Sequence, residues 1–171
     1  MTKPLVSIIT PCYNGEAFLK RYFESILNQT YPNLELIFIN DGSTDRTEEI
    51  ALSYRERLEK RGITYIYEKQ ENAGQAAALN RGLKLFKGEY LTWPDSDDEM
   101  VSDAVEKKVD YLEQHPDYGF CICKTKVVNE NNPEMKCGYY EYNPKNYDIV
   151  SFVENISMSV ADFAKQNNID L

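Results

Sequence analysis

The feature that most constrains this chain is a regular alternation of strand-like and helix-like segments. Between the strand-like runs, apolar residues recur every three or four positions, which is typical of amphipathic helices. Strands that alternate with helices in this way form βαβ units, whose crossovers give a mostly parallel sheet. The chain is therefore predicted to have an α/β fold, with helices on both faces of the sheet. The expected strands are 5–10, 34–40, 63–67, 90–93 and 118–128.

Four helices are expected between these strands. The first begins at Ala17. The second begins near Thr44 or Asp45, where Asp45 with Glu48 three residues later resembles a capping box, and it ends at Gly62. The third and fourth should cover residues 76–86 and a segment that breaks at His115-Pro116. Beyond residue 128 the pattern is looser, with a strand candidate at 139–142 and a short helix candidate at 148–155.

Composition excludes several classes of protein. A length of 171 residues suits one domain, and a net charge of −9 argues against a nucleic-acid reader, which needs a positive footprint. The longest apolar runs have four residues, far fewer than the roughly 20 of a membrane-spanning helix, and the start does not resemble a signal peptide. We therefore expect a cytoplasmic protein without a transmembrane segment.

Four cysteines are too few for a disulfide framework and suit reduced thiols. Cys121 and Cys123 would point to the same side of a strand, and a zinc site with Cys137 and His115 can be imagined. Their spacing does not match the usual zinc-binding pairs. We therefore interpret Cys121 and Cys123 as buried small residues, and His115 as a surface helix terminus.

Ligands of open α/β sheets bind beyond the carboxyl ends of the strands. The loops expected there are 11–15, 41–45, 72–74 and 95–98. Neither the G-x-G-x-x-G pattern nor the P-loop pattern is present, which argues against dinucleotide oxidoreductases and P-loop NTPases. Carboxylates spaced as in Asp95-Ser96-Asp97 can share Mn²⁺ or Mg²⁺ with phosphate oxygens, so the ion would neutralise a diphosphate.

Simpler interpretations compete with these. The D-x-D tripeptide can be a solvated acidic loop that caps the next helix, and Tyr13 can be a packing residue rather than a platform for a nucleobase. Asp41-Gly42 can form a hairpin turn, although helical periodicity follows it. Asp45 is most simply a structural residue that caps a helix.

Four motifs, taken in order, resemble family 2 glycosyltransferases of the GT-A fold. The first is VSIITPCYN at 6–14, and the second is ELIFINDGSTD at 35–45. The third combines NAG at 72–74 with ALNRG at 78–82, and the fourth is GEY at 88–90 followed by DSDD at 95–98. Several spaced motifs are far more specific than one. The resemblance implies a nucleotide-sugar donor, usually a UDP-sugar, a divalent metal, and transfer with inversion at the anomeric carbon.

The resemblance also assigns roles at the nucleotide end of the donor site. Pro11 and Tyr13 would line the nucleobase pocket, with the Tyr13 ring stacked on the base. Asp41 would form a hydrogen bond with the edge of the base. Asn72 and Gly74 would help to shape the donor pocket.

The diphosphate end is assigned in the same way. Asp95 and Ser96 would approach the ribose and the diphosphate. Asp97 would be the main ligand of Mn²⁺ or Mg²⁺, with Asp95 as the second. Residues 1–128 would then form the nucleotide-sugar-binding core, and residues 129–171 part of the acceptor side.

The catalytic base is not identifiable. The family places a general-base carboxylate, often in a Glu-Asp pair, after the D-x-D, and no such pair follows Asp98. We therefore expect a truncated or fragmentary glycosyltransferase whose acceptor is a saccharide or a lipid-linked saccharide, with peripheral membrane contact in the second case. The alternatives are a non-catalytic nucleotide-sugar-binding module and a nucleotidyltransferase. The carboxylates available as a base are Glu141, Asp148, Glu154 and Asp162.

Overall fold

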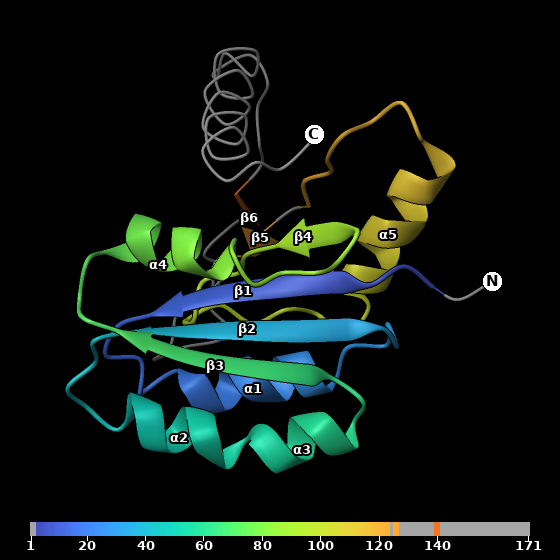
Figure 1. Cartoon of the computed structure of the whole chain (residues 1–171). Coiled ribbons are helices and arrows are strands. Elements are labelled where there is room, and N and C mark those ends of the chain that lie inside the picture. Colours follow the sequence, from blue (N-terminus) through green and yellow to red (C-terminus); the bar gives the residue numbers. More distant parts are fainter. Residues whose placement is uncertain (1–2, 124, 127–138, 141–171) are drawn as a thin grey trace. The chain divides into compact units, whose positions relative to one another are not determined.

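A four-stranded parallel sheet is the central element of residues 3–121 (Figure 1). The computed structural model describes residues 3–123, 125–126 and 139–140. In spatial order the strands are β3 (Thr64–Gln70), β2 (Leu34–Asp41), β1 (Val6–Cys12) and β4 (Tyr90–Thr92). All three pairings are parallel, so the carboxyl ends of the four strands lie at one edge of the sheet. The predicted α/β fold is confirmed.

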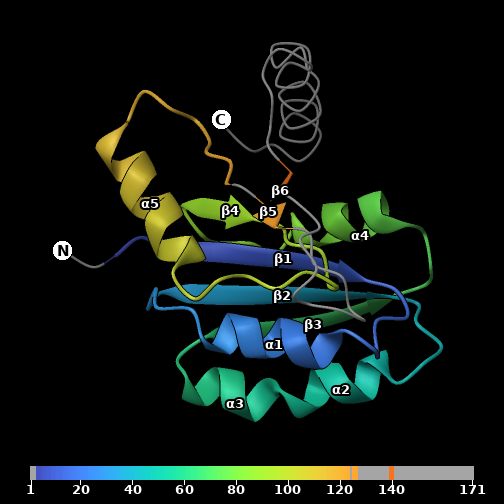
Figure 2. The ribbon, with the colours of Figure 1, turned by 180° about the vertical axis from the view of Figure 1, so that it is seen from behind.

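Helices cover both faces of the sheet (Figures 1 and 2). One face carries α1 (Leu19–Leu27), α2 (Thr47–Ser53) and α3 (Arg55–Lys60), and the other carries α4 (Gln75–Gly82). A fifth helix, α5 (Ala104–Gln114), follows the loop after β4. Each parallel strand is thus followed by helical structure, as right-handed crossovers require.

The core has two layers because successive residues of a strand point to opposite faces. Ile8 packs in the larger cluster with the buried residues of α1, while its neighbour Ile9 packs in the smaller cluster beneath α4. The larger cluster also contains Val105 and Val109, so the inner side of α5 belongs to it. β1 and β2 are buried along their whole length, as expected of β2, whose sequence is nearly continuously apolar, and of β1, which is rich in β-branched residues.

A buried carboxylate fixes the connection into β4. Glu35, on β2, accepts a hydrogen bond from the Ser7 hydroxyl and one of 2.6 Å from the Lys87 backbone N–H. The Ser7 hydroxyl in turn accepts the Gly88 N–H at 2.8 Å. Because these polar groups satisfy one another, the segment that leads to the D-x-D loop is tied to the middle of the sheet.

Two expected helices are shorter in the structure. The single helix expected from Asp45 to Gly62 is divided into α2 and α3 at Tyr54, where the Ser53 hydroxyl donates a 2.7 Å hydrogen bond to the Ile50 carbonyl. Such side-chain bonds to the preceding turn bend helices. The helix expected to reach Phe86 ends at Gly82. Beyond it, the Lys84 and Leu85 N–H groups donate to the carbonyls three residues earlier, those of Arg81 and Gly82, so the chain continues in tighter turns.

The strand expected at 118–128 is wrong for residues 118–123. Within the described ranges this segment pairs with no strand, and its apolar side chains Phe120 and Ile122 are 50% and 58% exposed. Cys121 is half-buried and Cys123 is exposed, which corrects their interpretation as buried residues. His115 follows the last residue of α5, as expected, is half-buried, and stacks on the rings of both Tyr111 and Tyr118.

The chain divides into two compact units, residues 1–121 and 122–171. In the second unit, β5 (Thr125–Lys126) pairs antiparallel with β6 (Tyr139–Tyr140), which falls within the strand expected at 139–142. The helix candidate at 148–155, Cys137 and the four candidate base carboxylates lie outside the described residues. The proposed boundary at residue 128 stays a prediction.

Candidate functional site

Six of the predicted site residues line one hollow at the carboxyl edge of the sheet. The hollow has a volume of about 340 Å³ and lies between the loops that follow β1 and β4. Residues 11–15 of this lining come from the end of β1 and the loop that follows it. Asp41 is the last residue of β2, and Gln75 is the first residue of α4. The lining residues are Pro11, Cys12, Tyr13, Asn14, Gly15, Phe18, Asp41, Gln75, Asp95, Ser96 and Asp97.

Hydrogen bonds in both directions connect the loop after β1 with the loop after β2. Asn14 adopts a left-handed conformation, with φ of 52°, and its Oδ1 accepts the Thr44 N–H at 2.8 Å. In return, the Gly15 N–H donates to the Thr47 hydroxyl at 2.8 Å, and the Glu16 N–H donates to Asp45 at 3.0 Å. These hydrogen bonds fix the backbone around Tyr13, a residue that is 54% exposed.

Asp45 is a structural residue, as predicted. One of its carboxylate oxygens accepts the Glu16 N–H, and the other accepts the Thr47 N–H at 3.0 Å, just where α2 begins. The helix therefore starts two residues after Asp45. The hairpin alternative for Asp41-Gly42 is wrong, because β2 leads into α2 and pairs in parallel with both of its neighbours.

Asp41 is buried at the base of the hollow and organises the loop after β3. Its Oδ1 accepts hydrogen bonds from Gln70 Nε2 at 2.7 Å and from the Ala73 N–H at 2.9 Å. Its Oδ2 accepts the Gly74 N–H at 2.9 Å. A carboxylate can accept about four such bonds, so capacity remains for a ligand.

Gly42 allows the close approach of two loops beside this carboxylate. It has a φ of +72°, and a Cβ at this position would lie 2.6 Å from the Asn72 backbone nitrogen. Only glycine meets both requirements without strain. Asn72 and Gly74 do not line the hollow. The Gly74 N–H donates to Asp41, and the Asn72 backbone nitrogen lies beside Gly42, so their role in shaping the donor pocket stays a prediction.

The D-x-D loop supplies carboxylates to the other side of the hollow. Burial, and then the negative charge of Asp97, raises the pKa of Asp95 above its ordinary value. Burial also raises the pKa of Asp98, with the charges of Asp97 and Asp95 adding to the effect. Like charges held this close favour binding of a cation, which removes their repulsion.

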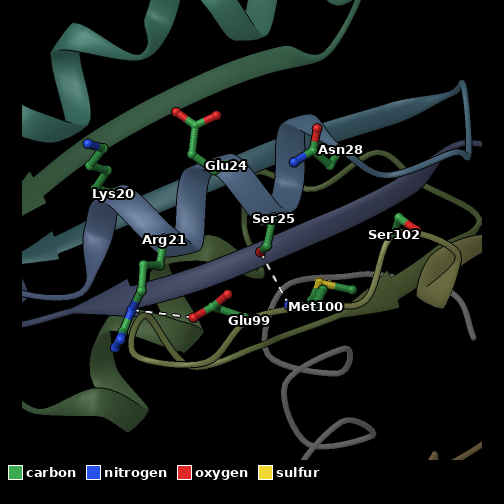
Figure 3. Close-up of a pocket in the computed structure, with 8 residues that line it drawn as sticks. All are labelled: Lys20, Arg21, Glu24, Ser25, Asn28, Glu99, Met100 and Ser102. Carbon is green, nitrogen blue, oxygen red and sulfur yellow. Dashed lines mark hydrogen bonds and ion pairs between the residues drawn. The ribbon is translucent and has the colours of Figure 1, made fainter. Parts of the chain in front are cut away.

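Main-chain and side-chain bonds attach the far end of this loop to α1. Buried Gln29 donates to the Val101 carbonyl at 2.9 Å and accepts the Val105 N–H at 3.2 Å. A second hollow, of about 510 Å³, lies at this attachment (Figure 3). There the Met100 N–H donates to the Ser25 hydroxyl at 3.2 Å, and Arg21 forms an exposed ion pair with Glu99. The D-x-D loop is therefore held at both ends.

The carboxylates of the hollow suit a divalent metal ion whose coordination shell is completed by a bound ligand. In the part of the chain that the structure describes, no three His, Cys, Asp or Glu side chains come together as a complete metal site. Mg²⁺ and chemically similar ions are often bound by one or two carboxylates, with phosphate oxygens and water completing the shell. Asp95 and Asp97 fit that arrangement.

Sequence reasoning missed some residues of the hollow. Cys12, Asn14 and Gly15 belong to a loop that was expected at the site, although no role was given to them. Burial raises the pKa of the Cys12 thiol, which keeps it neutral at ordinary pH. Gln75 was missed entirely; the only available signal is that a polar residue follows the Asn72–Gly74 turn at a helix start.

The chain resembles known proteins along most of its length. The model of a family described as "Glycosyl transferase family 2" matches residues 7–164. An uncharacterized glycosyltransferase of Rickettsia prowazekii is 38% identical over 135 residues, which are 78% of this chain and 40% of that protein. A putative teichuronic acid biosynthesis glycosyltransferase of Bacillus subtilis, TuaG, is 37% identical over 64% of this chain and 42% of its own length. The chain therefore spans less than half of either relative.

Solved structures of similar fold contain nucleotide sugars. TarS of S. aureus, in complex with UDP-GlcNAc, superposes with a TM-score of 0.60 and 26% identity, over 66% of this chain and 32% of that chain. The mannosyltransferase PcManGT of Pyrobaculum calidifontis, in complex with GDP-Man and Mn²⁺, gives 0.59 and 29%, over 66% and 33%. Within the described ranges, no helix is long and apolar enough to cross a membrane. From the family match and these likenesses, the chain belongs to glycosyl transferase family 2.

Proposed function

We propose that this chain carries the donor site of a metal-dependent, inverting glycosyltransferase that takes its sugar from a UDP-sugar. The observation that carries this proposal is the single hollow that holds Tyr13, Asp41, Asp95 and Asp97 together. An aromatic ring, a buried carboxylate and a pair of neighbouring carboxylates are suited to a nucleobase at one end and a metal-bound diphosphate at the other.

The comparisons support the choice of donor and pathway. TarS was crystallised with UDP-GlcNAc and PcManGT with GDP-Man and Mn²⁺, so relatives of this fold take nucleotide sugars. The name of TuaG links a relative to synthesis of a cell-surface polysaccharide. The proposed acceptor is accordingly a saccharide or a lipid-linked saccharide. The proposed place is the cytoplasm, with peripheral membrane contact when the acceptor is lipid-linked.

Five residues of the hollow have a defined task in this proposal. The Tyr13 ring stacks on the base, and Asp41 accepts a hydrogen bond from its edge. Asp95 and Asp97 hold Mn²⁺ or Mg²⁺, which when bound offsets the charge of the diphosphate as it leaves. Ser96 lies between the two carboxylates, where its hydroxyl can reach the ribose or the diphosphate.

Inversion also requires a base that removes the proton from the attacking acceptor hydroxyl. The carboxylates considered for this task, from Glu141 to Asp162, lie outside the described residues. Because no Glu-Asp pair follows Asp98 in the sequence, a non-catalytic module that binds nucleotide sugars is the second candidate function. It has the same donor site, and the two candidates differ only in turnover.

A calorimetric titration of the full chain with UDP and with GDP, each with and without Mn²⁺, tests the donor site. We expect one diphosphate to bind, and to bind at least tenfold more tightly with Mn²⁺ present. Asp97→Ala should remove this metal dependence. The matched control is Asp117→Ala, an exposed aspartate outside the hollow, which should leave both affinities unchanged.

The outcomes separate the candidates. Metal-dependent binding, together with transfer of the sugar to an acceptor when a nucleotide-sugar donor is supplied, supports the enzyme. Binding without transfer for any pair of donor and acceptor supports the module. If no diphosphate binds under either condition, both candidates are wrong for this chain. If Asp97→Ala binds UDP and Mn²⁺ as the wild type does, the metal site has been assigned to the wrong residue.

A further inference from the structure

Gln75 connects two parts of the hollow that are far apart in sequence. It is the first residue of α4, and its side-chain Nε2 donates a 2.7 Å hydrogen bond to Asp95 Oδ1. Gln75 and Asp95 both line the hollow. The bond therefore holds the first carboxylate of the D-x-D by one oxygen and leaves its other oxygen for a ligand.

This bond makes the two D-x-D carboxylates unequal. No side chain of the described residues donates a hydrogen bond to Asp97, which is exposed at the mouth of the hollow. Asp95, in contrast, is oriented before any ligand arrives. Because the Gln75 amide is neutral, it orients Asp95 without cancelling the negative charge that a cation needs. A lysine or arginine in the same place would compete with that cation.

The backbone leading to Gln75 is itself fixed. The two residues before it, Ala73 and Gly74, donate their N–H groups to the buried carboxylate of Asp41. The loop from Asn72 to Gln75 therefore joins the carboxylate at the base of the hollow to the D-x-D at its other side. A side chain at position 75 is placed by the same contacts that organise the nucleobase end.

We propose that Gln75 is a positioning residue of the donor site, which sets the orientation of Asp95 for the metal and the diphosphate. This inference rests on the proposed function, because it assumes that Asp95 faces the donor. It adds a residue from α4 that the motifs of the sequence did not identify. Removal of the amide should loosen the D-x-D loop and weaken metal-dependent binding, while binding of the nucleoside alone persists.

The first test needs no ligand. Hydrogen exchange of backbone amides is compared between the wild-type chain and Gln75→Met, which keeps the length of the side chain and removes its donor. We expect faster exchange at residues 96–98 in the variant and unchanged exchange in β1 and β2. Gln114→Met is the matched control, because Gln114 is an exposed glutamine at the end of α5. Equal exchange of the D-x-D loop in wild type and Gln75→Met would overturn the proposal.

The second test measures affinity. Removal of a hydrogen bond to a charged group typically changes an equilibrium constant by about tenfold. Gln75→Met should therefore bind UDP with Mn²⁺ about tenfold more weakly than the wild type. Binding of uridine without metal should change less than about twofold, and the melting temperature should match that of Gln114→Met. An equal loss for uridine and for UDP with Mn²⁺ would show a merely structural role. Tighter binding with Mn²⁺ would show that Gln75 competes with the metal, and either result contradicts the proposal.

Asp97→Ala, measured alongside, separates this inference from the proposed function. If wild type binds with metal dependence, Asp97→Ala does not, and Gln75→Met behaves as wild type, the function stands and the role of Gln75 is wrong. If wild type shows no metal dependence, the proposed function fails, and hydrogen exchange alone decides whether Gln75 orients the loop.

Discussion

At the scale of single residues, the site depends on side chains whose surroundings are already fixed. Tyr13 is exposed, yet its backbone is held by the bonds that Asn14 and Gly15 form with the next loop. A ring held in this way loses little conformational freedom on binding, which favours stacking on a base. The same principle applies to Asp95, which Gln75 holds in place.

Tyr13→Ala is expected to weaken nucleotide binding with and without metal. Loss of base stacking on an aromatic side chain costs about 1–3 kcal/mol, so UDP affinity should fall by roughly five- to a hundred-fold. Tyr13→Phe keeps the ring and should retain most of the affinity. Calorimetry with UDP measures both variants. Equal affinity of Tyr13→Ala and wild type would show that the ring does not contact the base.

The structure brings together those predicted site residues that lie next to a strand end. Pro11, Tyr13, Asp41 and the D-x-D were assigned to loops that the parallel sheet necessarily brings together. Gln75 could not be found in this way. Its importance rests on one side-chain contact with Asp95, and no local pattern specifies which two side chains will meet across a hollow.

At the scale of elements, the central strands of the sheet could be predicted from the sequence because two of them are buried on both faces. β2 has a nearly continuous apolar sequence, which is typical of a strand covered on both faces, and β1 is rich in β-branched residues, which favour strands. The segment 118–123 shows the limit of that reasoning. It is apolar and aromatic, but whether such a segment becomes a strand depends on a neighbour to pair with, and this is a property of the tertiary structure.

Close packing of α4 on the sheet gives a prediction about stability. A Cβ at Gly82 would lie 2.3 Å from Ile9 Cγ2, and Ile9 is fully buried in β1. Gly82→Ala should therefore destabilise the fold by about 1–3 kcal/mol despite the better helix propensity of alanine. Urea denaturation measures the change. Asn80→Ala, at an exposed position of the same helix, should stay within about 0.5 kcal/mol of wild type, and a Gly82→Ala variant as stable as wild type would refute the close approach.

The contact between α1 and α3 gives a prediction about pH. Arg57 donates two hydrogen bonds, of 2.5 and 2.9 Å, to the Glu24 carboxylate, and this partner lowers the pKa of Glu24. A lowered pKa means that the stabilisation is complete above the ordinary value of 4.5 and is lost as the pH falls below it. Because the pair is largely exposed, its contribution is less than about 1 kcal/mol.

Glu24→Gln should accordingly be slightly less stable than wild type at pH 7 and equally stable at pH values well below the lowered pKa. Denaturation at a series of pH values measures this difference. Glu71→Gln, an exposed glutamate outside the contact, serves as the control. A stability difference that persists or grows in acid would contradict the assigned role of the ion pair.

At the scale of the whole molecule, charge and architecture point to the same requirement. The chain has a net charge of −9, and its hollow gathers Asp41, Asp95 and Asp97. A diphosphate is repelled from such a surface unless a cation accompanies it. The proposed function therefore requires that metal and nucleotide meet in this hollow.

Paramagnetic broadening by Mn²⁺ tests this claim most directly. Amide resonances of the labelled full chain are recorded with Mn²⁺, before and after addition of UDP. The account predicts that UDP strongly increases broadening at residues 95–98 and 12–15, the two sides of the hollow, and that Asp97→Ala abolishes the increase. Broadening centred on Glu24 and Glu99, which line the second hollow, or broadening that UDP leaves unchanged, would contradict it.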